Sequence, residues 1–486
     1  MPTNGEPRRA ITLGGGGPAA GLHIGVLEAL ANQPDLHFDV WSLSCIGAWV
    51  GIVYNQSDKP NAKGKVEETY EFFRDGVFRD DEGYRRFPIN TVFGPDWRSN
   101  IDAFNKFVTD PKNYKDFQWQ PYRIFDYVQE SLSIVMDQLP TGERRSFKRL
   151  DEGDLNRWIL NQVMAPNPFI RYLTSLMYLS KFNGLSRINY PESEFMKKIK
   201  FDRLSPSGRD DAEKKPLIFH NAWDLDRHEL TFFANRPMPV LNKTDESIKK
   251  RYGGPITAQS LCACSALPFI EETVEIDGTT YCEGALVDTV NFEGLLDLQV
   301  RGQKLDEIWI SRIVDSKQIR KPDNLHDALA NLCQLFAASV GEDDVKLFKY
   351  HVRYDKRKCD ASKDNTAEDQ NYKKTRAEAS KNNAAKTKNS KAKDSQVHSS
   401  SDVWNGTVVE IHVPGHINFK WNHSNLDNGR KLGRESAEQA IKQYRQNKDT
   451  PHPGEPLFIN ERPEQDADWR RIRDDYQKLK KALAES

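Results

Sequence analysis

The sequence lacks the long apolar run that a membrane-spanning helix requires. No stretch approaches the ~20 apolar residues needed to cross a bilayer, and the first nine residues are polar, without the apolar core of a secretory signal. Charged residues make up 29% of the chain, and the mean hydropathy is −0.73. We therefore expect a cytoplasmic protein that meets a membrane, if at all, only at its surface.

Cysteine patterns typical of disulfide scaffolds or zinc sites are also absent. The six cysteines are scattered. Residues 262 and 264 are too close together for a zinc knuckle of the usual spacing, and no second Cys or His pair accompanies them. We expect reduced thiols and a site that needs neither a metal nor a cofactor.

An excess of charge of either sign is missing as well. The chain has 70 Lys and Arg against 71 Asp and Glu, for a formal net charge of −1. Such a chain has no overall attraction to nucleic acid or anionic lipid, so any attraction must come from local patches. We expect no nucleic-acid partner, and the composition leaves the oligomeric state open.

What the sequence does contain is an α/β pattern at both ends. Residues 10–13 and 38–43 read as buried strands, and each is followed by glycine and a helical period, over 21–30 and 46–54. Strand, turn and helix in repetition predict an α/β sheet with parallel strands. Further elements follow: strands at 217–222, 229–233, 308–311 and 407–413, and helices at 257–267 and around 436–444.

The middle of the chain differs in character from its ends. Residues 59–211 are rich in aromatic and charged side chains with few strand signals, which predicts a helical insertion or lid. Residues 359–402 are low in complexity and Lys-rich, which predicts a disordered loop. We therefore assign the α/β domain to residues 1–58, 212–358 and 403–450, and a charged C-terminal tail to residues 451–486.

The second strand ends in a turn that has the form of a nucleophile elbow with cysteine in place of serine. The turn reads Leu43-Ser44-Cys45-Ile46-Gly47, and the small residues after Cys45 leave room for close backbone approach. A cysteine at a helix N-terminus feels the positive end of the dipole, which favours the thiolate. Cys45 is therefore a candidate nucleophile, although a buried structural cysteine is the competing interpretation.

A run of glycines follows the first strand. Consecutive N–H groups at Gly15, Gly16 and Gly17 form an anion site suited to a phosphate or to the oxyanion of acyl transfer. The run also matches a loose dinucleotide-binding pattern, but that pattern needs an acid at the end of the second strand. Because that strand ends at Ser44 and Cys45, nucleotide binding is the less favoured alternative.

An acidic turn is the third candidate. Glu283 follows a hairpin signal at residues 277–281 and precedes Gly284 and Ala285. A carboxylate at such a turn can act as a general base, first toward a nucleophile and then toward water. A solvated turn acid is the competing interpretation.

Taken in order, these motifs resemble those of the patatin-like phospholipase family. Residues 15–27 are similar to its glycine-rich oxyanion motif and first helix, residues 43–47 to its G-x-S-x-G elbow, and residues 265–288 to the segment around its D-G-[GA] turn. The resemblance covers residues 9–55, 215–314 and 403–444. It implies a three-layer α/β sandwich with a mainly parallel central sheet, here carrying a helical insertion.

The resemblance also implies an acyl-ester hydrolase that acts on lipid or lipid-like esters. The implied catalytic residues are Cys45 as nucleophile and Glu283 as base, with the oxyanion hole at Gly15, Gly16 and Gly17 and supporting turn residues Gly47, Gly284 and Ala285. A Cys–His pairing with His23 or His220 is a further option that no motif supports.

The chain also departs from the family's pattern. Family members use Ser and Asp where this chain has Cys45 and Glu283, and often carry Arg or Lys where it has Ala19. Leu43 replaces the first elbow glycine. These departures support the alternative of a catalytically silent patatin-fold protein that binds lipid or a protein partner.

Overall fold

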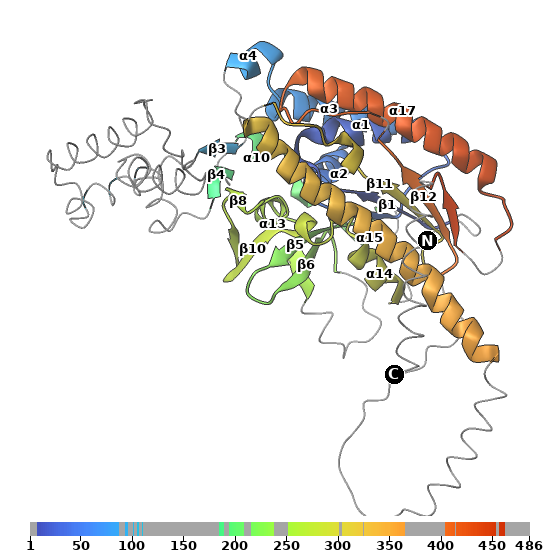
Figure 1. Ribbon diagram of the computed structural model, residues 1–486. Helices are drawn as coiled ribbons and strands as arrows, with labels where there is room; N and C mark the ends of the chain where they lie inside the picture. Colours follow the sequence, from blue (N-terminus) through green and yellow to red (C-terminus); the bar gives the residue numbers. More distant parts are fainter. Residues whose placement is uncertain are drawn as a thin grey trace, which may run out of the picture. The chain divides into compact units, whose positions relative to one another are not determined.

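The computed structural model describes the α/β core and parts of its surroundings (Figure 1). The described residues are 7–86, 93–95, 101, 105, 109, 184–188, 194–208, 215–237, 251–300, 304–323, 325–364, 404–413, 415–452 and 456–461. The chain divides into two compact units. One comprises Met1–Gly94, Ile188–Pro268 and Thr273–Ser486, and the other comprises Pro95–Arg187 and Phe269–Glu272.

The first unit is built on one large sheet. In the described residues its strands are β1 (Arg9–Leu13), β2 (Val40–Leu43), β5 (Leu217–Asp224), β6 (Glu229–Ala234), β7 (Tyr252–Pro255), β9 (Val274–Ile276), β10 (Thr279–Glu283), β11 (Glu307–Ser311), β12 (Thr407–Ile411) and β13 (Leu457–Ile459). Eight of them follow the order β13-β12-β11-β1-β2-β5-β10-β9, and β6 and β7 branch from β5. The run from β13 to β5 is parallel throughout, as predicted.

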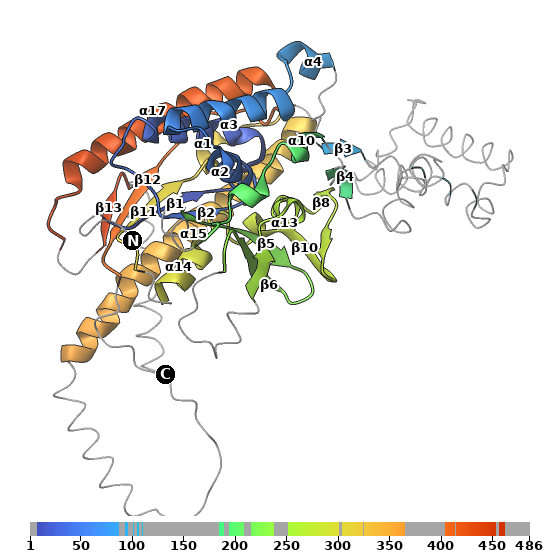
Figure 2. The same cartoon turned by 180° about the vertical axis from the view of Figure 1, so that it is seen from behind.

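Both faces of this sheet are buried under helices. One face carries α1 (Ala20–Leu30), α2 (Ile46–Gln56), α3 (Ala62–Gly76) and α17 (His423–Asn447), and the other carries α14 (Phe292–Val300) and α15 (Leu325–Asp364) (Figures 1 and 2). Alternate strand residues enter the two cores. Ile11 and Trp309 pack toward the first set of helices, and Ala10 and Ile308 toward the second. Burial on both faces explains the nearly continuous apolar runs of these strands.

The contact between α1 and α17 is a backbone contact. A Cβ atom added at Gly25 would lie 2.0 Å from the carbonyl oxygen of Arg430, and one at Gly433 would lie 2.0 Å from that of Leu22. Only glycine fits at such positions, because any side chain would overlap the facing main chain. The two helices also join the chain's N-terminal and C-terminal segments into one layer (Figure 1).

The antiparallel end of the sheet carries the acidic turn. β5 pairs with β2 in parallel and then with β6 and β10 in antiparallel fashion. The predicted hairpin between β9 and β10 is confirmed, and its turn residues Asp277 and Gly278 both have positive φ, at 50° and 80°. Positive φ at both central positions is the geometry of a type I′ turn.

Several boundaries differ from the sequence-based prediction. α3 lies in the first compact unit and packs on α1 and α2, although its residues fall within the predicted insertion. α15 continues through Asp364, past the predicted start of the Lys-rich loop, and β13 lies within the predicted C-terminal tail. Most of the insertion, the remainder of the Lys-rich loop and residues 462–486 lie outside the described residues.

The remaining described elements are short. A separate three-stranded sheet has the order β3-β4-β8. These strands and the other short elements are β3 (Phe93–Pro95), β4 (Gly184–Ile188), β8 (Phe269–Glu271), α4 (Asp81–Arg86), α10 (Glu194–Lys197), α13 (Ala258–Ala263), η1 (Gly17–Ala19), η3 (Phe201–Arg203), η4 (Gly284–Leu286) and η5 (Ser316–Gln318). Among the described helices, none combines the length and hydrophobicity needed to cross a membrane.

The α1–α17 contact gives a stability prediction. Gly433→Ala should lower the free energy of unfolding by about 3 kcal/mol, because its methyl group would overlap the main chain of α1. Gly208→Ala is the control, since its Cβ atom would meet nothing within 4 Å. Urea titration followed by circular dichroism should show the loss for the first variant only. Equal midpoints for both variants would contradict a main-chain contact between the helices.

Candidate active site

The candidate nucleophile lies on a strained turn between β2 and α2. Cys45 is the N-cap of α2 and has φ 46° and ψ −124°. A non-glycine residue rarely adopts positive φ, and such strain is characteristic of functional turns. Gly47 makes the turn possible, because a Cβ atom there would lie 2.1 Å from the carbonyl oxygen of Leu13. The sequence pattern of a nucleophile elbow thus has the geometry of one.

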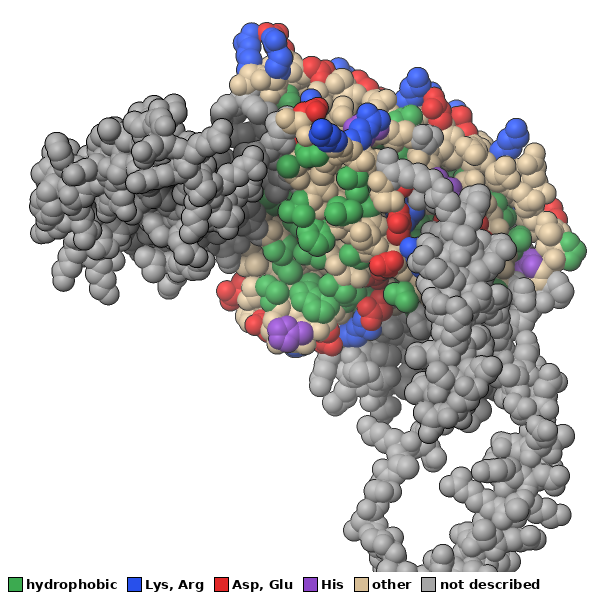
Figure 3. Space-filling model, in the orientation of Figure 1, with side chains coloured by type: hydrophobic (Ala, Val, Ile, Leu, Met, Phe, Trp, Pro, Cys, Tyr) green, Lys and Arg blue, Asp and Glu red, His purple; other side chains and the backbone are tan. Residues whose placement is uncertain are grey.

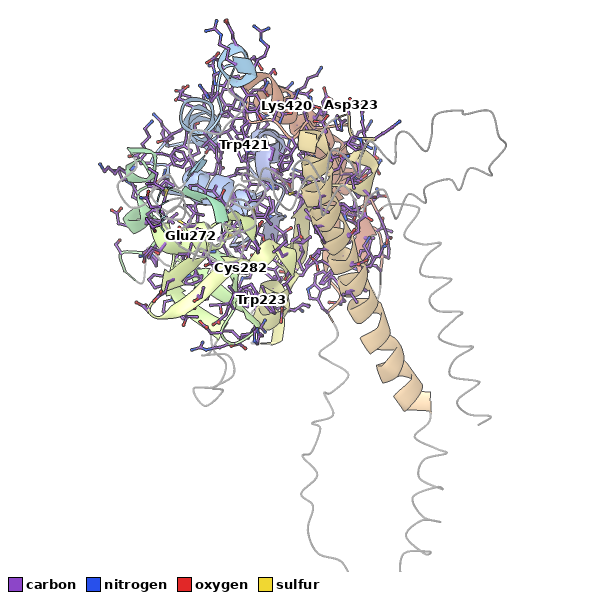
Figure 4. The ribbon with its side chains drawn as sticks, turned by 60° about the vertical axis from the view of Figure 1, so that its left-hand side comes forward. Trp223, Glu272, Cys282, Asp323, Lys420 and Trp421 are labelled. Atoms are coloured by element: carbon purple, nitrogen blue, oxygen red, sulfur yellow. The ribbon has the colours of Figure 1, made fainter. Side chains whose placement is uncertain are left out.

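The candidate base lies at the end of β10. Glu283 pairs with Ala222 of β5, and its N–H donates to the carbonyl of Ala266 at 2.9 Å. The short helix η4 begins at Gly284, where a Cβ atom would lie 2.8 Å from the side chain of Asn221. The neighbouring Cys282 pairs with Trp223, and Figure 4 labels both. Pairing within the sheet therefore fixes the position of the acidic turn and the direction in which its chain runs.

The fold brings the two candidate side chains together. The Cys45 thiol and the Glu283 carboxyl group lie close enough for each to shift the pKa of the other. Their relative exposures are only 8% and 7%. The geometry joins two residues that lie more than 200 positions apart in the sequence, and it places no histidine in this contact.

Burial sets the protonation states of the pair. It raises the pKa of Glu283 to about 7, and the neighbouring Cys45 side chain acts against this rise. Burial also raises the pKa of the Cys45 thiol well above its ordinary value, and the charge of Glu283 raises it further. The expectation that the helix dipole favours a thiolate is therefore wrong for this environment. Cys45 is a neutral thiol beside a carboxyl group that titrates near neutral pH.

A second cysteine supports the elbow. The N–H of Cys45 donates to the sulfur of Cys264 at 3.0 Å, and Cys264 is fully buried. This contact occupies the main-chain donor of the nucleophile's own residue. The sequence carries no signal for this contact, because the two cysteines lie 219 residues apart in the chain. No group of three or more His, Cys, Asp or Glu residues in the described part of the chain is arranged to hold a metal ion.

The glycine loop lies against the candidate nucleophile, but its donors are not equivalent. A Cβ atom at Gly15 would lie 2.9 Å from Ala285 and 3.2 Å from Cys45, so only glycine permits this approach. The N–H of Gly15 donates to the carbonyl of Thr289 at 3.1 Å. A donor already bonded to the protein is not available to an oxyanion. Of the three predicted donors, Gly16 and Gly17 therefore remain, and Gly15 allows the close approach.

The two histidines considered as partners of Cys45 are committed elsewhere. His23 bonds Ser311 and the carbonyl of Gly14, and His220 bonds Ser260. Both are fully buried, and burial lowers the pKa of each to about 4. The option of a Cys–His pair is not supported, because both histidines bond other groups and neither contributes to the pKa shift of the Cys45 thiol.

One known protein family matches the part of the chain that contains these motifs. The family model for patatin-like phospholipases matches residues 11–296, more than half of the chain. The chain belongs to the patatin-like phospholipase family. A search of curated proteins finds no match. Among solved structures, VipD from Legionella pneumophila is similar at 12% identity, over 90% of this chain and 67% of that one, with a TM-score of 0.31.

The patatin-like segment thus includes the glycine loop, the elbow and the acidic turn. It also includes Cys264 and Thr289, which bond the elbow and the loop. The helix α17, which packs on α1, lies beyond the matched residues. Family membership accounts for the fold of the site, in which this chain carries Cys45 at the elbow and Glu283 at the acidic turn.

Apolar side chains are exposed beside η4 and on α15. Val287, which follows η4, is 44% exposed, and Phe336 on α15 is 56% exposed. α15 packs against η4, and hydrophobic side chains gather on the face of the molecule shown in Figure 3. Such side chains suit a ligand with an apolar part.

The raised pKa of Glu283 makes stability depend on pH. The unfolded chain releases this proton near pH 4.5 and the folded chain near pH 7, so wild-type protein loses stability as pH rises between these values. The Gln side chain of Glu283→Gln does not titrate. The free energy of unfolding of this variant should therefore exceed that of wild type by an amount that grows to about 3 kcal/mol above pH 7.

Denaturant unfolding at pH 4, 6 and 8 measures this difference. The control is Glu275→Gln, which removes an exposed carboxylate from the adjacent strand β9. If the difference in free energy of unfolding between Glu283→Gln and wild type stays constant from pH 4 to pH 8, the pKa of Glu283 is not raised by burial.

Proposed function

We propose that this chain is an acyl-ester hydrolase that cleaves lipid or lipid-like esters through a Cys45–Glu283 dyad. The observation that carries the proposal is the burial of the Cys45 thiol beside the Glu283 carboxyl group, with Cys45 on a strained elbow. Membership in the patatin-like phospholipase family supports the substrate class, and exposed apolar residues such as Val287 and Phe336 are compatible with an acyl chain.

The first half-reaction forms a thioester. As the Cys45 sulfur attacks the ester carbonyl, its proton passes to the Glu283 carboxylate. The N–H groups of Gly16 and Gly17 stabilise the oxyanion of the tetrahedral intermediate. When the intermediate collapses, the C–O bond breaks and the leaving alkoxide takes the proton from Glu283. The products are an alcohol and an acyl group bound to Cys45.

The second half-reaction uses water. Glu283, again ionised, takes a proton from water as its oxygen attacks the thioester carbonyl. The same glycine donors stabilise the second oxyanion. Collapse breaks the C–S bond, the sulfur recovers its proton from Glu283, and a fatty acid leaves. A buried carboxyl group with a pKa near neutrality suits this alternation, because it both accepts and returns a proton at physiological pH.

The alternative is a catalytically silent patatin-fold protein that binds lipid or a protein partner. It is supported by the raised pKa of the Cys45 thiol, since a neutral thiol is a weaker nucleophile than a thiolate. It is also supported by Ala19, which places no cation where the family often has one. The dyad hypothesis answers the first objection, because the carboxylate removes the proton during the attack.

The dyad should behave as one unit in mutagenesis. Cys45→Ala and Glu283→Gln should each lower kcat/KM for a phospholipid or p-nitrophenyl ester by about 10³-fold. The double variant should be little worse than either single variant, because members of one catalytic unit are not additive. Cys45→Ser with Glu283→Asp should retain or gain activity.

Cys282→Ala is the matched control for these variants, since it lies on the same strand next to Glu283 without taking part in the proposed chemistry. It should keep wild-type activity. If wild-type protein turns over no short or long acyl ester while the Ser–Asp variant does, the silent alternative is the correct one.

The pH profile should report the ionisation of the base. Because the reaction needs ionised Glu283, kcat/KM should rise with pH and reach half of its plateau near pH 7, where burial places the pKa of this group. Initial rates with a non-ionising ester between pH 5 and 9 measure the curve. A midpoint near pH 4.5 would instead indicate a solvated carboxylate.

A further inference from the structure

His23 lies beneath the glycine loop and bonds it directly. It is in the first turns of α1 and is fully buried. Its Nδ1 atom lies 2.9 Å from the Ser311 hydroxyl oxygen, and its Nε2 atom lies 2.8 Å from the carbonyl oxygen of Gly14. Both ring nitrogens are therefore occupied, one by the end of β11 and one by the loop.

These partners determine the tautomer of the ring. A carbonyl oxygen only accepts hydrogen bonds, so Nε2 carries the proton and donates to Gly14. Burial lowers the pKa of His23 to about 4, which keeps the ring neutral at physiological pH. Nδ1 then accepts the hydrogen bond that the Ser311 hydroxyl donates. The ring is thus held in one orientation from both sides.

The same bonds fix the peptide group between Gly14 and Gly15. Its carbonyl accepts from His23, and its N–H donates to Thr289 at 3.1 Å. The preceding N–H, of Gly14, donates to the carbonyl of Ser311 at 3.1 Å. A peptide plane bonded at both edges cannot rotate, although glycine itself permits many conformations. The directions of the following N–H groups, at Gly16 and Gly17, depend on this plane.

We infer that His23 is a positioning residue for the oxyanion hole, holding the Gly14 carbonyl and so fixing the loop that carries the N–H groups of Gly16 and Gly17. The inference rests on the proposed function, because an oxyanion forms only if the chain cleaves esters. His23 touches neither the thiol nor the substrate in this role. It acts through the loop, and Ser311 acts through His23.

The chain offers a matched control in His220. It is equally buried, and burial lowers its pKa to about 4 as well. Its Nε2 atom lies 3.1 Å from the Ser260 hydroxyl oxygen and its ring stacks on Phe233 with 5.5 Å between centroids. None of these contacts involves the glycine loop. Replacing His220 thus removes a buried imidazole without releasing the loop.

The kinetic test compares His23→Leu, His23→Gln and His220→Leu with an ester substrate. His23→Leu should lower kcat by about 10²-fold, the effect of a donor misplaced by about 1 Å, while KM stays nearly unchanged. His23→Gln keeps an N–H donor for the Gly14 carbonyl and should recover most of the rate. His220→Leu should keep the wild-type kcat. A His23→Leu variant with wild-type kcat would overturn the inference.

Hydrogen exchange tests the loop independently of activity. Exchange of the amides in residues 14–17, followed by mass spectrometry, should quicken by about 10-fold or more in His23→Leu and in Ser311→Ala, but not in His220→Leu. If wild-type protein cleaves no ester yet the loop responds in this way, the proposed function fails and the structural role stands. Unchanged exchange in folded His23→Leu overturns the role.

Folding of the His23→Leu variant is checked by thermal unfolding. If that variant does not fold, His23→Gln and Ser311→Ala decide. Ser311→Ala should still quicken loop exchange and lower kcat, whereas His23→Gln should resemble wild type in both. Positioning through this ring would be refuted if Ser311→Ala showed wild-type loop exchange and wild-type kcat. It would also be refuted if folded His23→Gln showed rapid loop exchange and lost its activity.

Discussion

Main-chain hydrogen bonds at the carboxyl edge of the sheet hold the candidate site together. The end of β1 and the loop after it are bonded in this way to three segments, namely the elbow after β2, the end of β11 and the segment after η4. Ser44 N–H donates to Leu13, Gly14 N–H to Ser311 and Gly15 N–H to Thr289. Buried peptide groups must be paired, because each one left without a partner costs as much as a lost hydrogen bond. The pairing requirement therefore fixes the separation of the three segments, and with it the dyad.

Burial of the dyad has two opposing consequences. It keeps the thiol neutral and so lowers its intrinsic reactivity. It also raises the pKa of Glu283 to about 7, where a carboxyl group exchanges protons readily at physiological pH. A serine in the same surroundings would be a much less acidic nucleophile than Cys45, since a hydroxyl holds its proton more tightly than a thiol. In the proposed mechanism, a Cys–Glu pair therefore differs from a Ser–Asp pair in its proton transfer.

Much of the fold was predictable from particular patterns in the sequence. The alternation of glycine turns with apolar strands predicted the parallel strands β1 and β2 and the helices that follow them. The Asp277-Gly278 pair predicted the β9–β10 hairpin. The order of the motifs predicted the patatin-like family, whose model matches residues 11–296. The first thirteen residues of α17 were missed, because His423–Glu435 is mostly polar and contains two glycines. Those glycines are what allow α17 to contact α1.

By itself, the sequence determined the residue types at the elbow, the glycine loop and the acidic turn, because strained turns and close approaches select glycine locally. Only the tertiary structure decided how those residues are used. It brought Cys264 to the N–H of Cys45, occupied the N–H of Gly15 with Thr289, and placed His23 under the Gly14 carbonyl. It also reversed the expected ionisation of Cys45. Desolvation depends on which segments pack over a group, and those segments lie hundreds of residues away in the chain.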